Sequence, residues 1–493
     1  MTRLSAENLP EGTRCFSYDR NAVTTGIVHF GIGNFHRAHQ AVYVEELLER
    51  GDTQWGITGI SLRSSAMKDA LEPQDYLYTL AVLDEEREYR VIGSIKDVVV
   101  APHEPQAVID LIAAPATQIV SSTITEKGYY LSSGKVDFHT PALKAELTSL
   151  LSPTTVYGFL TQGLIQRFLN APSSKLTIMC CDNISAGGEM LAQGVHRLLS
   201  KHNPHALKWS KNHVSFISSM VDRVSPATDD TLRDAVLRDT GRRDVSPVSA
   251  EAFSQWIIED NFAGQRPDFD HVGALFVEDI SPFESMKLSY LNAAHTIAST
   301  LGYLSGDVYV HEAIERPDVL QFMRQALYKN VMPNAPVPDG CDAIIYIEDV
   351  IKRFQNCHLP YANLQVGTDS SQKIQQRWFP TIDTALSQNR DVSYFAFSLA
   401  AWVIFIQTAL KNDVLNDPKK ASLMKIDTRN LNTLVDSYLK IVNADKFKFH
   451  KHPEFNDTVI TYGQTIKNHG IQTALSSFLK KKRLLSLIEK TEL

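Results

Sequence analysis

Two short stretches of this chain combine residue types that could carry out chemistry. The first, GIGNFHRAHQ at 31–40, directly follows the apolar run IVHF at 27–30. Glycines at this spacing after a strand allow a tight turn and let backbone N–H groups approach a pyrophosphate, and the following helix N-terminus adds a favourable dipole. Gly31 and Gly33 fit these two roles, so the stretch predicts a dinucleotide-binding loop.

The same stretch carries two histidines that raise the alternative of a metal site. His36 takes the place of the third glycine of the usual pattern, and His39 follows three residues later. Two histidines supply only two ligands, and the sequence contains no His-Glu-x-x-His or Cys-x-x-Cys motif to complete a site. We therefore expect structural histidines that bond to neighbouring backbone, and no metal.

The nature of the dinucleotide depends on the residues after the second strand, where an acid usually grips the ribose 2′-hydroxyl. The chain reads GISLRSSAMKD at 59–69, with Arg63, Ser64 and Ser65 and no carboxylate before Asp69. A cation and two hydroxyls suit a 2′-phosphate at least as well as a 2′-hydroxyl. The alternative is a simple polar loop, and NAD and NADP both remain open.

The second stretch is MKLSYLNAAH at 286–295, within a predicted helix. Ser281 and Glu284 have the spacing of a capping box, and Pro282 occupies the favoured first helical position. The sequence therefore predicts that a helix begins at this point.

On a regular helix Lys287, His295 and Asn292 fall at about 0°, 80° and 140°, so that one face carries all three. A lysine desolvated by apolar neighbours can act as a general base, and amide groups can hold a developing alkoxide or carbonyl oxygen. Asn183, in MCCDNISAGG at 179–188, is a second amide at the expected carboxyl end of a strand, where open α/β sheets bind ligands. The pattern suits alcohol oxidation without zinc. The alternative for the three helix residues is a helix at the protein surface, where all three side chains are hydrated. The alternative for Asp182, next to Asn183, is a helix cap.

The order of elements predicts how these residues are positioned. Up to about residue 280, short β-branched runs alternate with amphipathic stretches, which is typical of a mostly parallel α/β sheet. Beyond it the periodicity is mainly helical. We expect an α/β, Rossmann-like domain at 1–280 and a mainly α-helical domain at 281–493. The expected strands are 26–30, 55–62, 118–124, 176–180, 213–218 and 273–277, with a two-stranded insertion at 76–95; the expected helices are 37–49, 155–168, 283–304, 317–328, 341–355, 392–411, 428–442 and 464–480.

Composition narrows the class of protein. The chain has 493 residues and a net charge of −7, with no basic arm that would indicate nucleic-acid binding. Five cysteines without paired spacing fit a reducing compartment, and the polar segment 1–20 is unlike a signal peptide. The apolar run at 394–406 is too short to span a bilayer and predicts a buried core helix. We expect a cytoplasmic protein that binds neither nucleic acid nor membrane.

The chain resembles the polyol-specific long-chain dehydrogenases, the mannitol 2-dehydrogenase group, which includes fructuronate and tagaturonate reductases. The resemblance covers nearly the whole chain. It rests on HFGIGNFHRAHQ (29–40), TITEKGYY (123–130), MCCDN (179–183), MVDRVSP (220–226), QWIIEDNF (255–262) and MKLSYLNAAH (286–295). It implies a metal-independent enzyme in which hydride passes between a nicotinamide and a substrate carbon, and a monomer.

The resemblance also implies roles for individual residues. Lys287 would be the general base, Asn183 and Asn292 the oxyanion pair, His295 would orient substrate hydroxyls, and Glu126 would lie on a proton path. Cofactor contacts would come from the loop at 31–36, including Phe35 and His36, from Arg63, Ser64 and Ser65, and from Asp222; substrate contacts would add Gln365 and Lys373.

Two departures from the family pattern leave the specificity open. Ser65 and Ala66 stand where NAD-dependent mannitol enzymes tend to carry acids, and Gln365 stands where they have an arginine. Mannitol and fructose are the first substrates to consider, followed by a uronate such as fructuronate and by a hexitol phosphate. A non-catalytic dinucleotide sensor would need Gly31 and Gly33 but not Lys287.

Overall fold

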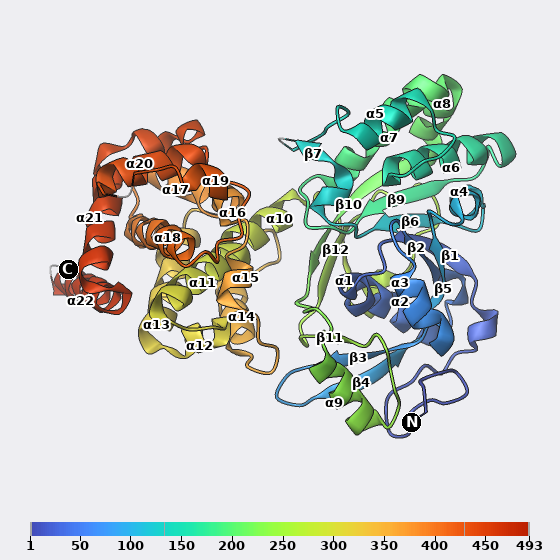
Figure 1. The fold of residues 1–493 in the computed structure, drawn as a ribbon, viewed down its shortest axis with the longest axis horizontal. Coiled ribbons are helices and arrows are strands. Elements are labelled where there is room, and N and C mark those ends of the chain that lie inside the picture. Colours follow the sequence, from blue (N-terminus) through green and yellow to red (C-terminus); the bar gives the residue numbers. More distant parts are fainter. Residues whose placement is uncertain (1, 133, 428, 492–493) are drawn as a thin grey trace. The chain divides into compact units, whose positions relative to one another are not determined.

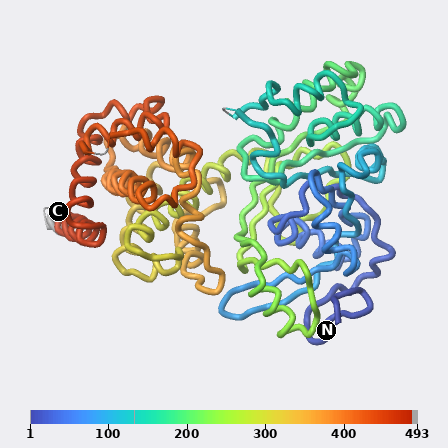
Figure 2. The backbone as a smooth tube through the Cα atoms, viewed as in Figure 1, coloured from blue at the N-terminus to red at the C-terminus, as the bar shows by residue number. Residues whose placement is uncertain are grey.

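The computed structural model describes residues 2–132, 134–427 and 429–491 (Figure 1). The chain divides into two compact units, Met1–Ser281 and Pro282–Leu493, which are described separately. The path of the chain through each unit can be followed in Figure 2.

The first unit is built on one large sheet, whose order within the described residues is β13-β12-β10-β9-β6-β1-β2-β5. Neighbouring strands are parallel except β10 and β12, which pair antiparallel. The expected mostly parallel sheet is confirmed. The strands are β1 (Thr25–Phe30), β2 (Gly56–Ser61), β5 (Ile95–Val100), β6 (Ile119–Ser122), β9 (Leu176–Cys180), β10 (Val214–Asp222), β12 (Gln255–Glu259) and β13 (Leu275–Val277).

The strand order creates a crevice beside β1. From β1 the chain continues to β2 on one side and later returns to β6 on the other side. Loops that leave the carboxyl ends of β1 and β6 therefore diverge, and this is the position where open α/β sheets bind ligands. The loop that starts at Gly31 lies at this point.

Helices cover both faces of the sheet because each strand alternates its apolar side chains. In β1, Ile27 packs into one core with Leu47 of α2, whereas Val28 and Phe30 pack into a second core with Phe159 of α6. The helices are α1 (Asn34–Ala38), α2 (Gln40–Glu49), α3 (Ala66–Leu71), α4 (Pro105–Ala113), α5 (Pro141–Thr148), α6 (Val156–Asn170), α7 (Gly187–His202), α8 (Pro204–His213) and α9 (Asp230–Thr240).

The predicted two-stranded insertion is present as the antiparallel pair β3 (Tyr78–Val82) and β4 (Glu88–Ile92). It forms a small sheet with β11 (Val248–Ala250). The next strand, β5, belongs to the large sheet; neither β5 nor β12 was predicted from the sequence. Both have short apolar runs whose partners lie far away in the chain. A further small pair joins β7 (Leu131–Ser132) and β8 (Lys135–Val136).

The second unit is helical, as expected. The predicted segment 464–480 is divided at Gly470, whose positive φ of 77° ends one helix before the next begins. The helices are α10 (Ser281–Lys287), a π-helical segment η6 (Leu288–Asn292), α11 (Ala293–Ser305), α12 (Val310–Glu315), α13 (Pro317–Ala326), a second π segment η7 (Leu327–Val331), α14 (Ala343–Gln355), α15 (Asn363–Val366), α16 (Ser370–Arg377), α17 (Phe379–Ser387), α18 (Ser393–Lys411), α19 (Lys420–Leu423), α20 (Leu431–Ile441), α21 (Pro453–His469) and α22 (Ile471–Thr491).

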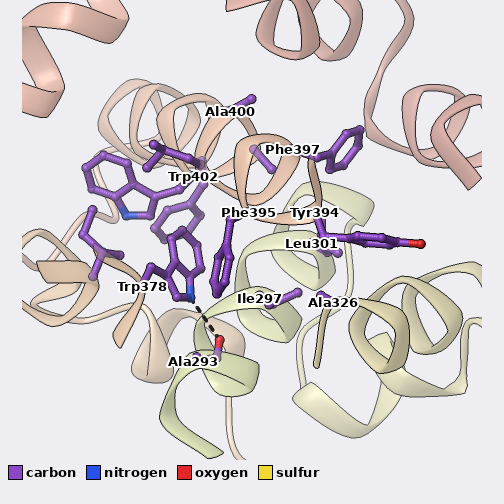
Figure 3. Packing of buried hydrophobic residues seen from close by; sticks show 14 of the residues in the cluster. Ala293, Ile297, Leu301, Ala326, Trp378, Tyr394, Phe395, Phe397, Ala400 and Trp402 are labelled. Carbon is purple, nitrogen blue, oxygen red and sulfur yellow. Dashed lines mark hydrogen bonds between the residues drawn. The ribbon is translucent and has the colours of Figure 1, made fainter. Parts of the chain in front are cut away.

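The apolar run at 394–406 forms α18, the centre of the second unit's core. Phe395, Phe397 and Trp402 of this helix are buried, and Trp378 beside them donates its indole N–H to the carbonyl of Ala293 at 3.3 Å (Figure 3). Among the described residues α18 is the one helix with the length and apolarity to cross a membrane, but 72% of its most apolar window is buried inside the protein. Its apolarity is explained by packing.

A buried carboxylate of α2 binds the residue that follows β4 and a tyrosine that precedes β1. Glu45 is fully buried, and its Oε2 accepts hydrogen bonds from the Gly93 amide at 2.8 Å and from the Tyr18 hydroxyl at 3.0 Å. Burial raises the pKa of Glu45 to about 7, although these bonds and Arg90 favour the charged form. The folded protein therefore binds this proton more tightly than the unfolded chain does.

We expect Glu45 to make stability fall as pH rises. Since the folded pKa lies above the unfolded value, this residue's contribution is fully present below about pH 4.5 and is lost as pH rises toward 7, a change of up to about 3 kcal/mol. Glu45→Gln should therefore gain stability relative to the parent protein between pH 5 and pH 8 in urea unfolding. The exposed Glu86→Gln is the control, and a pH-independent difference for Glu45→Gln would contradict the assignment.

Candidate active site

The turn after β1 requires glycine at one position and leaves space at the other. Gly31 has φ of 98°, donates its amide to the Ile60 carbonyl at 2.9 Å, and a Cβ there would lie 2.1 Å from the carbonyl oxygen of Thr123. Gly33 precedes α1 as its N-cap, and a Cβ there would meet no atom within 4 Å. Gly31 is thus fixed by close packing, whereas Gly33 borders open space at a helix N-terminus.

A buried histidine supports this turn from behind. His29 of β1 hydrogen bonds with the Ser121 hydroxyl at 2.7 Å and the Thr123 hydroxyl at 2.8 Å, and Thr123 donates to the Gly31 carbonyl at 3.0 Å. Complete burial lowers the pKa of His29 to about 3, so the ring is neutral at ordinary pH. The chain of bonds links the Gly31 turn to the end of β6.

The histidines of the first motif point inward. His36 is 1% exposed and stacks on His29 with ring centroids 3.5 Å apart, and burial lowers its pKa. His39 bonds to the Gln255 carbonyl at 2.9 Å and stacks against Phe35. In the described residues no three His, Cys, Asp or Glu side chains are grouped as a metal site. His39 has the backbone bond expected of a structural histidine.

The segment after β2 places the residues that would meet a ribose. Ser61 donates to the Ser64 carbonyl at 2.6 Å, and Ser65 donates to the Asp69 carboxylate at 2.7 Å. Arg63 is exposed and forms no ion pair with any residue in the described parts of the chain. An exposed cation beside two serines is thus left at the end of β2.

One carboxylate holds the loops after β6 and β9 together. Asp182, just after β9, accepts hydrogen bonds from the amides of Ile124 at 2.7 Å and Thr125 at 3.2 Å, and from the Tyr129 hydroxyl at 2.6 Å. Burial raises the pKa of Asp182 even though these bonds favour its charged form. The alternative that Asp182 caps a helix is wrong, because the following helix α7 is capped at Ala186.

The backbone at Thr125 is strained, and Asp182 holds it. Thr125 has φ of 65° and ψ of 158°, a region that residues other than glycine rarely occupy and that costs about 1–3 kcal/mol. The residues on either side of this clamp are Glu126 and Asn183, both exposed. The structure thus brings together the ends of β1, β6 and β9 in the first unit, where Asp222 also ends β10, 5% exposed.

In the second unit, Lys287 ends α10 and is 8% exposed. The helix begins at Ser281, whose amide donates to Asp279 at 2.9 Å. The uniform helical wheel is wrong beyond Lys287, because η6 is a π segment in which the Ala293 amide donates to the carbonyl of Leu288, five residues back. In a π segment, residues five positions apart, such as Lys287 and Asn292, lie closer to the same side of the helix than they would in an α-helix.

Other helices surround this segment. The ring of His295 contacts the rings of Phe354 and Tyr361, with centroid distances of 4.2 Å and 5.5 Å. Helix α16 packs against η6, and Lys373 of α16 donates to the Val366 carbonyl at 3.3 Å. Gln365, on the short helix α15, is exposed.

Sequence reasoning missed three residues that shape these sites. His29 and the clamping role of Asp182 depend on strands that are distant in sequence, and no local pattern reports such pairing. Arg377 was missed as well, although its spacing of four residues from Lys373 is a signal that could have placed both on the same helix face.

We expect alanine at the two glycines to act differently. Gly33→Ala should fold normally and weaken NADH or NADPH binding about tenfold or more, because its methyl group enters the space expected for the pyrophosphate. Gly31→Ala should instead lower the melting temperature, because its Cβ meets the Thr123 carbonyl at a positive φ. Thermal unfolding and quenching of protein fluorescence by the coenzyme separate the two effects. Equal melting-temperature losses in both variants would contradict this interpretation.

We expect Asp182→Asn to fold but to lose catalysis. The amide can accept fewer of the three bonds, so the loop at Thr125 relaxes and Glu126 is displaced. Turnover should fall about 10- to 100-fold with coenzyme affinity changed less than threefold, and the pH profile of turnover should shift. Asp234→Asn, at an exposed position of α9, is the control. A variant with parental turnover and pH profile would show that the clamp is dispensable.

Comparisons with known proteins agree with this architecture. A model of the mannitol dehydrogenase Rossmann domain matches residues 25–271, and a model of the mannitol dehydrogenase C-terminal domain matches residues 279–467. The chain is 31% identical to a polyol:NADP oxidoreductase of Gluconobacter oxydans, covering 96% of this chain and 99% of that protein. It is 34% identical to D-mannonate oxidoreductase of Escherichia coli, with 87% and 90% covered.

A solved structure is similar over almost the whole chain. Mannitol 2-dehydrogenase of Pseudomonas fluorescens, in a ternary complex with NAD and D-mannitol, superposes with a TM-score of 0.84 at 33% identity, covering 97% of this chain and 100% of that one. The chain therefore belongs to the mannitol dehydrogenase family and is an NAD(P)-dependent oxidoreductase that acts on CH–OH groups.

Proposed function

We propose that the chain is a metal-independent secondary-alcohol dehydrogenase that interconverts a polyol and a ketose, with mannitol and fructose the first pair to test. The observation that carries the proposal is Lys287, buried at the start of a π segment that brings Asn292 toward its side of the helix. Burial favours the neutral amine of a lysine, which is the form that accepts a proton from an alcohol.

In the proposed mechanism one residue acts as the general base, and the others bind the substrate or transfer the proton. A bound nicotinamide supplies the hydride acceptor or donor. Lys287 takes the hydroxyl proton during oxidation and returns it during reduction. Asn183 and Asn292 hold the substrate oxygen through their amide groups, and His295 orients a neighbouring hydroxyl. Glu126 exchanges the lysine's proton with solvent.

The proposal assigns the dinucleotide to the unit at 1–280 and the substrate to the unit at 281–493. The cofactor meets the loop containing Gly31 and Gly33, the helix that begins at Asn34, and Asp222; Gln365 and Lys373 line the substrate side. Phe35 and His36 act through packing of that helix against the sheet.

Cofactor preference rests on the segment after β2. Arg63 is exposed and has no ion-pair partner among the described residues. Beside it, the Ser64 carbonyl accepts from Ser61, and the Ser65 hydroxyl donates to Asp69. This combination favours a 2′-phosphate as much as a 2′-hydroxyl, so we propose that the enzyme accepts both NADP and NAD. The similar proteins include a polyol:NADP oxidoreductase and an enzyme solved with NAD.

A sugar acid is the second candidate substrate, with the same mechanism. One relative is named D-mannonate oxidoreductase, which favours a uronate such as fructuronate as the ketone. A hexitol phosphate is a third candidate. We further propose a cytoplasmic monomer that works without nucleic-acid, membrane or metal partners; retention of activity after dialysis against a strong chelator checks the last point.

We expect Lys287→Ala to abolish ketone reduction. Loss of the general base should lower turnover about 10²- to 10⁴-fold while coenzyme binding stays nearly intact. The substrate and coenzyme are identified first, by stopped-flow assays of four ketones with NADH and with NADPH: fructose, fructuronate, tagaturonate and fructose 6-phosphate. The turnover of the variant is then compared with that of the parent enzyme at pH 6–10. The exposed Lys329→Ala is the matched control. Unchanged turnover of Lys287→Ala across that range would refute the assignment.

A further inference from the structure

Arg377, the last residue of α16, lies next to the proposed oxyanion residue. Its Nη1 donates to the backbone carbonyl of Asn292 at 3.1 Å and to the hydroxyl of Thr296 at 2.8 Å. Neither acceptor is charged, and within the described residues Arg377 forms no ion pair. Burial lowers its pKa to about 10, with no carboxylate to offset this effect.

A second arginine of the chain shows what a purely structural role looks like. Arg167 is also buried without a counter-charge, and its pKa is likewise lowered to about 10. However, all three of its nitrogens are used: Nε donates to Ser174, and Nη1 and Nη2 donate to the carbonyls of Ile112, Ala114, Thr117 and Lys175.

Arg377 uses only one of its nitrogens. A guanidinium has five N–H groups, and both bonds of Arg377 come from Nη1. Nε and Nη2, which carry the other three, bond to no described residue and are not among the atoms sealed from solvent. One edge of the guanidinium is therefore available to a ligand, and this edge has the geometry that pairs with a carboxylate.

The surroundings of Arg377 add positive charge. Lys373 lies four residues earlier on α16, and residues at this spacing are neighbours on a helix surface. Asp417, the carboxylate packed at the start of α16, accepts from the Ser371 amide and hydroxyl and from the Lys419 amide. It is engaged at the opposite end of the helix from Arg377.

We propose that Arg377, together with Lys373, binds a terminal oxyanion of the substrate and makes a ketose with a terminal carboxylate a better substrate than the neutral ketose. This inference rests on the proposed function, since it concerns the far end of the molecule whose carbonyl is held by Asn183 and Asn292. The guanidinium donates to the Asn292 carbonyl. The anionic end of the substrate would therefore be held at a fixed position relative to Asn292, the residue proposed to hold the reacting oxygen. The recognition is non-covalent and needs no further reactant.

The test compares three ketones that differ in their terminal group: fructose, fructuronate and fructose 6-phosphate. With the parent enzyme we expect kcat/KM for fructuronate to exceed that for fructose at least tenfold. Arg377→Gln keeps a donor for the Asn292 carbonyl but removes the charge. It should lower kcat/KM for fructuronate about 30- to 100-fold, mainly through KM, and change that for fructose less than threefold.

Two further variants make the result specific. Arg377→Lys should restore part of the preference for fructuronate, because it restores the charge without the bidentate edge. The exposed Arg390→Gln, which removes a cation elsewhere in the same unit, should leave the ratio of the two substrates unchanged.

The outcomes separate this inference from the proposed function. Equal losses on fructose and fructuronate in Arg377→Gln would show that Arg377 only orders Asn292, and the inference would be wrong. A parent enzyme that reduces fructose and ignores fructuronate would overturn the inference and leave the proposed function intact. Fructose 6-phosphate as the best ketone, with the same sensitivity to Arg377→Gln, would support the oxyanion site but assign it to a phosphate. If no ketone is reduced, both proposals fail.

Discussion

The carboxylate of Asp182 is the interaction on which the proposed catalytic edge of the first unit depends. It accepts two backbone amides and a tyrosine hydroxyl, and it holds Thr125 in a conformation that a free loop would abandon. A strained backbone persists only where its surroundings over-determine it. Because Asp182 adjoins Asn183 and Thr125 adjoins Glu126, one half-buried carboxylate positions two residues that the proposed mechanism needs.

The same edge is reinforced from the β1 side. Gly31 packs against the Thr123 carbonyl so closely that no side chain fits, and His29 bonds to the hydroxyls of Ser121 and Thr123. Residues 121–125 therefore contact both the Gly31 turn and the Asp182 carboxylate. In a sheet with its switch point between β1 and β6, the two loops that diverge around the crevice are held by each other as well as by their own strands.

In the second unit, polar side chains of the proposed site lie beside an apolar helical core. The π segment redirects the helix just after Lys287 and leaves the Asn292 carbonyl to accept from Arg377 and Thr296. Arg377 then carries a charge that no described carboxylate neutralises. Arg167 differs, because all of its N–H groups donate to other residues of the protein and it therefore has a structural role. Arg377 retains N–H groups that are available to a substrate.

Much of this protein was determined by its sequence alone. Alternating apolar runs predicted the parallel sheet, and the limits of β9 matched the expected 176–180, an apolar run that is buried along its whole length. The glycine pair and the motif around Lys287 predicted the family. The tertiary structure decided what depends on distant partners: the place of β5 and β12 in the large sheet, the π segment, the clamp at Asp182 and the half-used guanidinium of Arg377. Local periodicity reports which face of an element is apolar, whereas hydrogen bonds between residues 50 or more positions apart leave no periodic signal, and these bonds decide where the polar groups of the site lie.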